Sequence, residues 1–257
     1  SMKNSLRYII VAVVVLFCTT MFAGCSSGAV NFYVTSFPTK LVYKVGENVD
    51  LSGLKIESIN SDGTNTMVSL KDAQISTIDT STSGVKKVKV SKGELSTSFN
   101  VYVADIVITD SDNFKQKIAQ AQDGDVVYLT QGNYIPQNAT DTSYKDVVVD
   151  KSVVIIGDGA SKTKFAGNFL VGAENSSGEF VAKQNFKNVK FLNIGFEIKH
   201  TTQNELFSYT GPYGRADKNG ALNIFDTQNM LVFNCNSTKE FTKRYILYNK
   251  IGRIYIR

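Results

Sequence analysis

The chain is poor in the residues that build most metal and redox centres. Its 257 residues include three cysteines, one histidine and no tryptophan. Cys18 and Cys25 lie near the N-terminus, so Cys235 is the single cysteine of the body, which excludes an internal disulfide and a cysteine-rich metal site there. His200 is alone, which excludes a site of several histidines. We expect no resident metal and no cofactor.

An excess of basic charge is also missing from the body of the chain. The whole chain has 28 basic and 23 acidic residues, but two basic residues lie within 1–24 and six within 239–257, against one acidic residue. Residues 25–238 therefore hold 20 basic and 22 acidic residues. A nucleic-acid-binding body would need a basic stripe for phosphate contacts, so we exclude nucleic acid as a partner.

The N-terminus has the layout of an export signal. Lys3 and Arg7 precede an apolar run of eleven residues, 8–18, and small residues follow at 23 and 24. The segment Phe22-Ala23-Gly24-Cys25 resembles the bacterial lipobox, which implies cleavage before Cys25 and a lipid on its thiol. We predict a signal peptide at 1–24, a tether at 25–30 and an outward-facing chain anchored to the bacterial membrane. The alternative is an uncleaved membrane helix, for which the apolar run is short.

Residues 31–105 consist of short strand patterns separated by turns. Alternation is clear at 55–59 and 98–103, and Ser61-Asp62-Gly63-Thr64 is a hairpin turn signal. Turns at this spacing favour a small β-sandwich. A strand expected at 84–90 carries several lysines, which suit either a solvated edge strand or a surface for an acidic glycan: Lys86, Lys87, Lys89 and, just beyond it, Lys92.

The same region resembles a known family. The segments Tyr43-Lys44-Val45-Gly46-Glu47 and Asp50-Leu51-Ser52-Gly53-Leu54, followed by Asp62-Gly63 and a closing strand at 98–103, are similar to bacterial Ig-like domains of surface proteins. The resemblance implies a β-sandwich that serves as spacer, stalk or adhesion module, and it implies no catalytic residue.

Residues 106–238 open with one expected helix at 112–122, capped by Ser111 or Asp112 and carrying Phe114 and Ile118 on one face. A strand at 126–129 and a turn at Gly132-Asn133-Tyr134 follow. Short apolar strands with Asn, Gly or Asp at their corners then recur, at 147–149, 153–156, 189–192, 221–225 and 230–233. Repeats of this kind predict a solenoid, in which corner asparagines bond their neighbours in the next coil.

This second region resembles the start of a pectate-lyase-like right-handed parallel β-helix. The resemblance rests on the short helix, on Gly-Asp-Val-Val-Tyr-Leu at 124–129, on Gly-Asn-Tyr at 132–134 and on Val-Val-Ile-Ile-Gly-Asp-Gly at 153–159. It implies that the helix caps the apolar end of the solenoid, toward which Phe114 and Ile118 would point. Few coils fit into 106–238. Residues 239–257 form a basic segment of uncertain origin, either a tail or a truncated end.

The expected fold class is therefore all-β: an Ig-like sandwich at 31–105, then a short capped β-helix at 106–238. The resemblance would imply the catalytic motifs of β-helix lyases and hydrolases, but no Arg-x-Pro-x-x-Arg segment, adjacent Asp-Asp pair or Gly-His-Gly occurs. The weak catalytic candidates are Arg215, Asp217 and Asp226. His200 could be a general base, but a surface role suits a lone histidine better.

A carbohydrate-binding site is the other expectation for the loop around 211–217. Aromatic rings can stack on sugars, which makes Tyr209 and Tyr213 candidates together with Arg215, and Phe207 a further one. We expect a calcium ion only if the protein is a lyase. The acidic pairs Asp110/Asp112 and Asp123/Asp125 lack the spacing of a calcium loop and suit turns.

Three functions remain open from the sequence. The first is a surface lipoprotein that binds carbohydrate or mediates adhesion without catalysis. The second is a polysaccharide lyase or glycoside hydrolase acting on uronate-containing glycans. The third is a structural spacer without a ligand.

Overall fold

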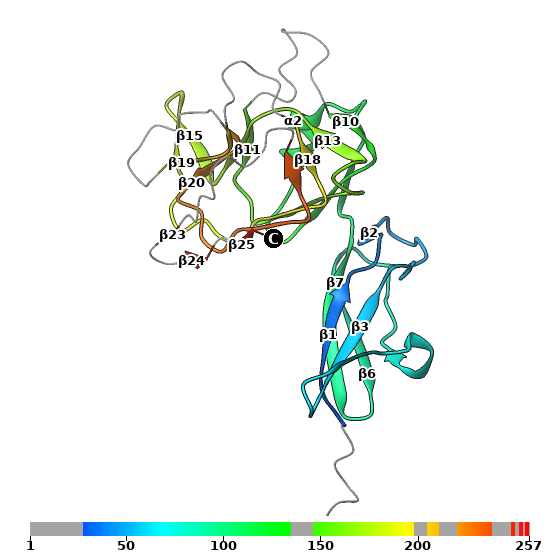
Figure 1. The fold of residues 1–257 in the computed structure, drawn as a ribbon. Helices are drawn as coiled ribbons and strands as arrows, with labels where there is room; N and C mark the ends of the chain where they lie inside the picture. The colour runs from blue at the N-terminus through cyan, green and yellow to red at the C-terminus, as the bar shows by residue number, and fades with distance from the viewer. Residues whose placement is uncertain are drawn as a thin grey trace, which may run out of the picture. The chain divides into compact units, whose positions relative to one another are not determined.

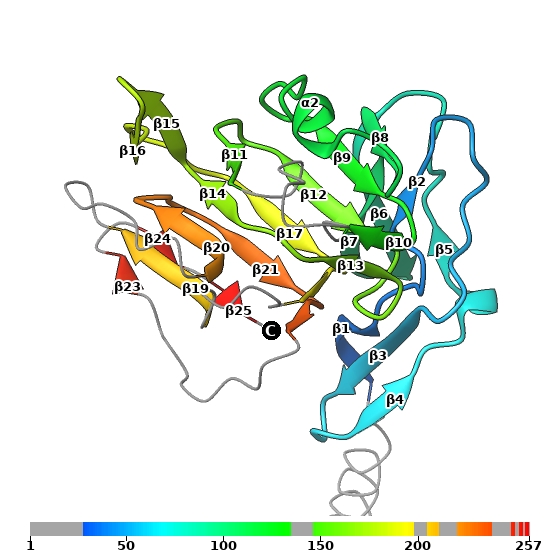
Figure 2. The ribbon, with the colours of Figure 1, turned by 90° about the horizontal axis from the view of Figure 1, so that it is seen from above.

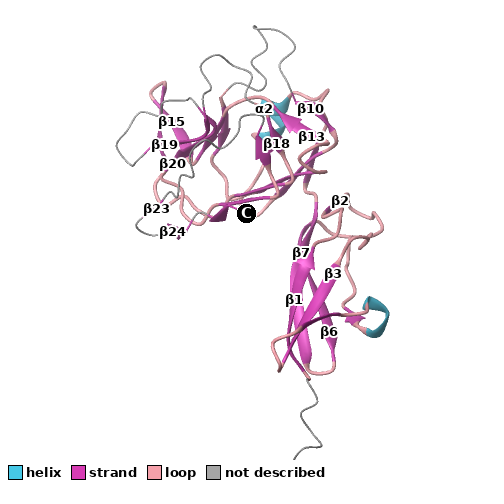
Figure 3. Cartoon of the chain, viewed as in Figure 1, coloured by secondary structure: helices cyan, strands magenta, loops and turns pink. Residues whose placement is uncertain are grey.

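The computed structural model describes residues 28–134, 146–197, 205–210 and 220–237, and the pairs 248–249, 252–253 and 255–256. The chain is mostly β (Figure 3), and most strand pairs are antiparallel before residue 104 and parallel after it. Helix is limited, within the described ranges, to α2 (Phe114–Ile118) and the 3-10 turn η1 (Leu70–Asp72). None of the helices in these ranges is long and apolar enough to cross a membrane.

The chain divides into two compact units. The first comprises the chain up to Phe37, Gly53–Ser76 and Lys89–Phe99, and the second comprises Pro38–Ser52, Thr77–Val88 and the chain from Asn100 onward.

The first unit contains an antiparallel sheet in the order β1 (Ala29–Ser36), β3 (Lys55–Asn60) and β4 (Asn65–Met67). Figure 1 shows β1 beside β3. The hairpin turn predicted at 61–64 is confirmed, because it joins β3 to β4. The Asp62 carboxylate accepts hydrogen bonds from the backbone N–H and the hydroxyl of Thr64, at 2.9 and 2.6 Å. Gly63 has φ +81°, a conformation that favours glycine.

A second sheet has the order β2 (Val42–Tyr43), β7 (Leu95–Val103), β6 (Gly84–Lys92) and β5 (Gln74–Ile75). Within the first unit both sheets contribute buried side chains, among them Ile56 of β3 and Val90 of β6, and the rings of Phe37 and Phe99 meet edge-on at 6.1 Å. The interpretation of the lysine-bearing strand as an edge strand is wrong at one end. β5 pairs with Val90 and Ser91, which places β6 between two neighbours there.

Parallel pairing dominates the second unit. Sheet 1 has the order β25 (Tyr255–Ile256), β21 (Leu231–Phe233), β17 (Lys190–Leu192), β12 (Val154–Gly157), β9 (Val126–Leu129) and β8 (Ile106–Ile108). Sheet 2 has β10 (Gly132–Tyr134), β13 (Thr163–Phe165), β18 (Gly195–Phe196) and β22 (Asn236–Ser237). Sheet 3 has β11 (Val147–Val149), β14 (Phe169–Val171), β20 (Gly220–Phe225) and β19 (Glu205–Thr210). Figure 2 shows β9, β12, β17 and β21 of sheet 1 side by side.

The chain visits these sheets in rotation. β9, β10 and β11 belong to sheets 1, 2 and 3, and β12, β13 and β14 repeat that order. Equivalent residues stack in register, as Val127, Ile155, Phe191 and Val232 do in sheet 1. In-register residues of neighbouring strands point to the same side of a sheet, and all four of these side chains are buried in one core cluster. The third round departs from the pattern, since β19 and β20 both join sheet 3.

The predicted burial of the apolar face of the helix is confirmed. Phe114 and Ile118 of α2 are buried in the same cluster, and the Phe114 ring lies 5.1 Å from that of Phe165. The helix is shorter than the predicted 112–122 and is capped by Asn113, whose side chain accepts the N–H of Gln116. It ends early because the N–H groups of Gln120 and Ala121 bond three residues back, which tightens the chain out of α geometry.

Corner asparagines bond between successive rounds, as predicted. The Asn229 amide donates to Asn188 Oδ1 at 2.5 Å, and the Asn234 amide donates to Asn193 Oδ1 at 2.8 Å. All four residues have positive φ, between +51° and +66°, which asparagine tolerates better than most residues. Beyond residue 238, β23 (Tyr248–Asn249) and β24 (Gly252–Arg253) form an antiparallel pair, and β25 pairs with β21, so the basic segment adds a strand to sheet 1.

Candidate functional site

The outward faces of the three parallel sheets differ in character. On sheet 1 the outward row of Tyr128, Ile156 and Leu192 is buried. On sheet 3, Leu170 and Phe225 are buried under a hairpin formed by β15 (Ala173–Ser176) and β16 (Glu179–Ala182). Among the described residues, sheet 2 alone presents an outward row that is polar and in part exposed.

We call this row the open face. Asn133, Lys164, Gly195 and Asn236 stand in register on β10, β13, β18 and β22. Neighbouring strands are about 4.8 Å apart, so the row spans about 14 Å. Asn133 and Asn236 are exposed, and 42% of the Lys164 side chain is accessible. Inward of this row, Tyr134, Phe165 and Phe196 stack in the core and hold the strands rigid.

An ion pair lies on the open face. Lys164 Nζ is 3.6 Å from Glu197 Oε1, and the Glu197 side chain is only 11% accessible. Its backbone N–H donates to the carbonyl of Phe165, which fixes the start of this segment against β13. A lysine that leans over a buried carboxylate offsets the cost of burying that charge. In this ion pair, part of the Lys164 side chain still faces solvent.

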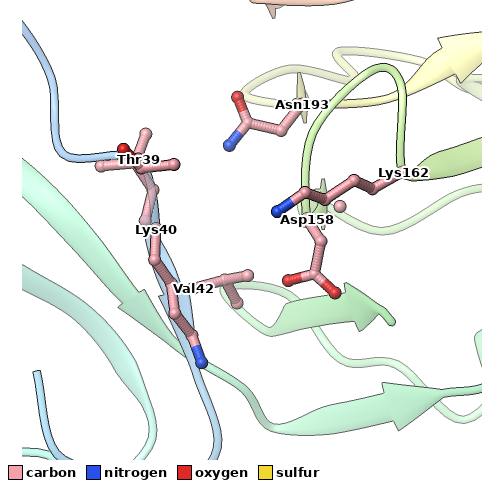
Figure 4. A pocket seen from close by; sticks show the side chains of 8 residues that line it. Thr39, Lys40, Val42, Asp158, Lys162 and Asn193 are labelled. Carbon is pink, nitrogen blue, oxygen red and sulfur yellow. The ribbon is translucent and has the colours of Figure 1, made fainter. Parts of the chain in front are cut away.

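A small cleft opens at the corner where the chain passes from sheet 1 to sheet 2. All of its lining residues belong to the second unit: residues 39–42 on one side, and Gly157, Asp158, Lys162 and Asn193 on the other. Figure 4 shows the side chains of Lys162 and Asn193 facing Thr39 and Lys40 across this space. We call it the corner cleft. Lys162 ends the turn before β13 and Lys164 lies on β13, on either side of Thr163, so the corner cleft adjoins the open face.

The charged groups of the corner cleft have defined partners, with one exception. Asp158 accepts the Tyr128 hydroxyl at 2.7 and 2.9 Å and the Gln131 N–H at 2.7 Å. Burial, together with this carboxylate, raises the pKa of Tyr128 above its ordinary value, so the phenol stays protonated and donates. Lys40 pairs with Glu47. Lys162 takes part in no ion pair with any residue that the structure describes.

Two glycines allow the corner to close this tightly. A Cβ on Gly157 would lie 2.5 Å from the carbonyl oxygen of Asn193 and 2.7 Å from Thr163 Cβ. A Cβ on Gly195 would collide with the carbonyl of Ala160. The turn at 158–162 can therefore lie against the next round only because both positions lack a side chain.

Most of the residues proposed from the sequence lie outside the described ranges. These are Cys25, His200, Tyr213, Arg215 and Asp217. Tyr209 is on β19, in register with Ile224 of β20, and Asp226 follows β20 directly with φ +41°. The backbones of Tyr209 and Asp226 are thus on neighbouring strands, while the grouping of Arg215 and Asp217 with them stays a prediction.

The acidic pairs considered for calcium have structural partners. Asp110 and Asp112 accept the backbone N–H groups of Asn133 and Thr109, at 3.1 and 2.7 Å. Asp123 and Asp125 accept those of Ser152 and Gln122, both at 2.8 Å. In the described ranges no three His, Cys, Asp or Glu residues gather closely enough to hold a metal ion. The turn duty expected for these carboxylates is confirmed, but the helix cap predicted at Ser111 or Asp112 is wrong, because Asn113 caps α2.

Cys235 is also a structural residue. Its thiol donates weakly to the carbonyl oxygens of Phe191 and Phe233, and burial raises the pKa of the Cys235 thiol to about 12. A thiol protonated at neutral pH is a poor nucleophile.

The residues of the open face were missed in the sequence. Asn133 was expected in a turn, yet Gly132–Tyr134 is strand β10, because its backbone pairs with Thr163–Phe165. A usable signal existed, since polar Lys164 alternates with the buried residues Thr163 and Phe165. Asn193 was predicted as a corner residue, but nothing in its sequence placed it beside Lys162.

Comparison with known proteins supports one part of the chain. The family model for the bacterial Ig-like domain (group 3) matches residues 37–103. The predicted Ig-like region is thereby confirmed, and such a domain is consistent with a surface or adhesion-type role. No curated protein matches the chain.

Proposed function

We propose that this chain is an exported lipoprotein of the bacterial surface, anchored through Cys25, that binds a glycan without cleaving it. In this proposal the Ig-like domain is followed by a short right-handed parallel β-helix, and the β-helix carries the binding site. The rotation of the chain through three parallel sheets and the asparagine pairs at its corners support the β-helix.

The observation that carries the proposal is the open face. Two of the three parallel sheets bury most of their described outward residues, whereas sheet 2 presents Asn133, Lys164 and Asn236 to solvent in one register row. An asparagine amide can donate to and accept from sugar hydroxyls, and a lysine ammonium can donate to them. A row about 14 Å long on a rigid scaffold suits an extended chain of sugars better than a compact ligand.

The described carboxylates favour binding over catalysis. Glycoside hydrolysis needs two carboxyl groups on either side of the scissile bond, one as acid and one as base or nucleophile. Glu197 is largely buried and paired with Lys164, and Asp158 is held by Tyr128 and Gln131. Both groups therefore have structural duties, which supports a binding protein.

The experiment measures co-sedimentation of the full chain, purified in mild detergent, with a panel of polysaccharides that includes uronate polymers with and without calcium. Lys164→Gln and Asn133→Ala are each expected to weaken binding about five- to tenfold, the effect of one lost hydrogen bond. Lys187→Gln is the matched control, because Lys187 is an exposed lysine at a different corner, between sheets 3 and 1.

Three results would count against the proposal. Unchanged binding in both open-face variants would show that the open face is not the binding site. Unsaturated or reducing-end products would show that the protein is an enzyme. Retention of a Cys25→Ala variant in the membrane fraction at unchanged mass would contradict the proposed lipid anchor.

A further inference from the structure

The corner cleft has room for a substituent of a sugar and not for the sugar ring. Its volume is about 80 Å³, which corresponds to the space of two or three water molecules at about 30 Å³ each. Pockets that enclose a whole small molecule begin at about 300 Å³. Because the corner cleft adjoins the open face, a group that projects from a bound glycan can enter it while the ring stays outside.

The charged side chains of the corner cleft balance one another. Lys40 pairs with Glu47. Asp158 and Lys162 stand at the two ends of one turn, and neither takes part in an ion pair with a residue that the structure describes. One carboxylate and one ammonium therefore remain for a ligand, with no excess of either sign. A neutral group that both donates and accepts hydrogen bonds matches such a pair.

Two donors of the corner cleft can meet a single oxygen atom. Figure 4 shows the amino group of Lys162 directed into the cleft. Asn193 Oδ1 already accepts the Asn234 amide at 2.8 Å, which leaves the Asn193 amide nitrogen as the group that faces the cleft. A carbonyl oxygen has two lone pairs, so one carbonyl can accept from both side chains.

An acceptor and an apolar side chain complete the corner cleft. Asp158 accepts the Tyr128 hydroxyl at 2.7 and 2.9 Å and the Gln131 N–H at 2.7 Å. An ionised carboxylate has about four lone-pair sites, so Asp158 can accept one more donor. Val42 also lines the cleft and is otherwise buried, and a methyl group placed against it would leave water, which is favourable.

We infer that the corner cleft receives the acetamido group of an N-acetylated sugar, in the glycan that lies along the open face. The acetamido carbonyl accepts from Lys162 and the Asn193 amide. The acetamido N–H donates to Asp158, and the methyl group lies against Val42. This inference rests on the proposed function and adds the substituent that the ligand carries.

Other small substituents match the corner cleft less well. An acetyl ester has the carbonyl and the methyl group but no N–H for Asp158. A carboxylate would meet the like charge of Asp158, and a free ammonium would meet that of Lys162. Only the amide satisfies the donors, the acceptor and the apolar side chain together.

The test compares three β-1,4-linked hexasaccharides that differ only at C2: cellohexaose with a hydroxyl, N-acetylchitohexaose with an acetamido group, and deacetylated chitohexaose with an amine. Isothermal titration calorimetry measures their binding to the full chain in mild detergent. N-acetylchitohexaose is expected to bind about tenfold tighter than cellohexaose, the effect of one or two added hydrogen bonds. Deacetylated chitohexaose should bind no tighter than cellohexaose.

Two variants of the corner cleft locate this preference. Asn193→Asp keeps the acceptor for Asn234 and replaces the donor by a negative charge, and Lys162→Met removes the ammonium but keeps an unbranched side chain. Each should lower the preference for the acetylated sugar about fivefold and leave cellohexaose binding unchanged. Lys164→Gln, on the open face, should instead weaken all three sugars alike.

The outcomes separate the inference from the proposed function. Equal binding of N-acetylchitohexaose and cellohexaose would overturn the inference, although the open face would still bind glycan. Tightest binding of the deacetylated form, or a preference that survives both cleft variants, would overturn it as well. If none of the three sugars binds, the inference is wrong, and the polysaccharide panel decides the proposed function separately. Thermal unfolding of each variant within about 3 °C of the wild type shows that a loss of binding is not a loss of fold.

Discussion

Sheets 2 and 3 are built from neighbouring strands of the same round, yet one turns outward to solvent and the other is covered. The middle residue of β13 is Lys164. β14 begins four residues after β13 ends, and its middle residue is Leu170. Lys164 remains 42% accessible, whereas Leu170 is fully buried. One outward position per strand therefore decides which face is available to a ligand.

The chain supplies the cover for the apolar face itself. The hairpin of β15 and β16 begins directly after β14 and places Phe180 and Ala182 against Leu170 and Phe225. On the open face, Gly195 of β18 is in register with Lys164, and the carbonyl of Ala160 lies where a Gly195 side chain would begin. The comparison teaches that a repeated strand pattern sets the scaffold, while insertions and outward residues decide what each face does.

The largest expected effect is on the covered face. Leu170→Ala should lower the free energy of unfolding by about 2–4 kcal/mol, because it removes buried side-chain volume beneath the hairpin. Lys164→Gln, at the corresponding position of sheet 2, should cost about 1 kcal/mol or less, since the side chain is partly exposed. Urea unfolding followed by circular dichroism measures both. Equal losses of unfolding free energy in the two variants would show that the faces of sheets 2 and 3 do not differ in burial.

An intermediate effect is expected at the corner between sheets 1 and 2. Asn234→Ala loses the hydrogen bond to Asn193 and forces alanine to φ near +52°, which should cost about 1–2 kcal/mol. Asn234→Gly keeps the backbone conformation and should lose less. Thermal melting of the two variants measures the difference, and an alanine variant as stable as the glycine variant would show that the positive φ carries no cost.

The smallest effect concerns Cys235, one residue before the open face ends at Asn236. Burial raises its pKa from an ordinary value near 9 to about 12, so the folded state favours the protonated thiol. This contribution to stability is present below pH 9 and is lost as the pH rises toward 12. At pH 9, alkylation of the Cys235 peptide, followed by mass spectrometry, should be at least tenfold slower in the folded chain than in urea. Similar rates in both states would mean that the thiol is exposed.

Much of the scaffold could be predicted from local pattern. Alternating strands, the turn at Asp62-Gly63 and the corner asparagines all depend on neighbours in sequence or on a regular repeat, and the structure has each of them. The helix was predicted too long, because its end depends on three-residue backbone bonds that residue spacing does not show. Asn133 was assigned to a turn because Gly-Asn-Tyr has no strand signal of its own, and only pairing with β13 makes it a strand.

The sequence by itself determined the Ig-like region, matched at 37–103, and the repeated short strands, because both follow from local composition and spacing. The export signal at 1–24 stays a prediction. Tertiary structure alone decided that Lys162, Asn193 and Thr39 share one cleft, although they come from three distant segments of the chain. It also decided which outward row stays open. Both depend on which strands pair and which insertion folds back, and these are properties of contacts between residues far apart in the chain.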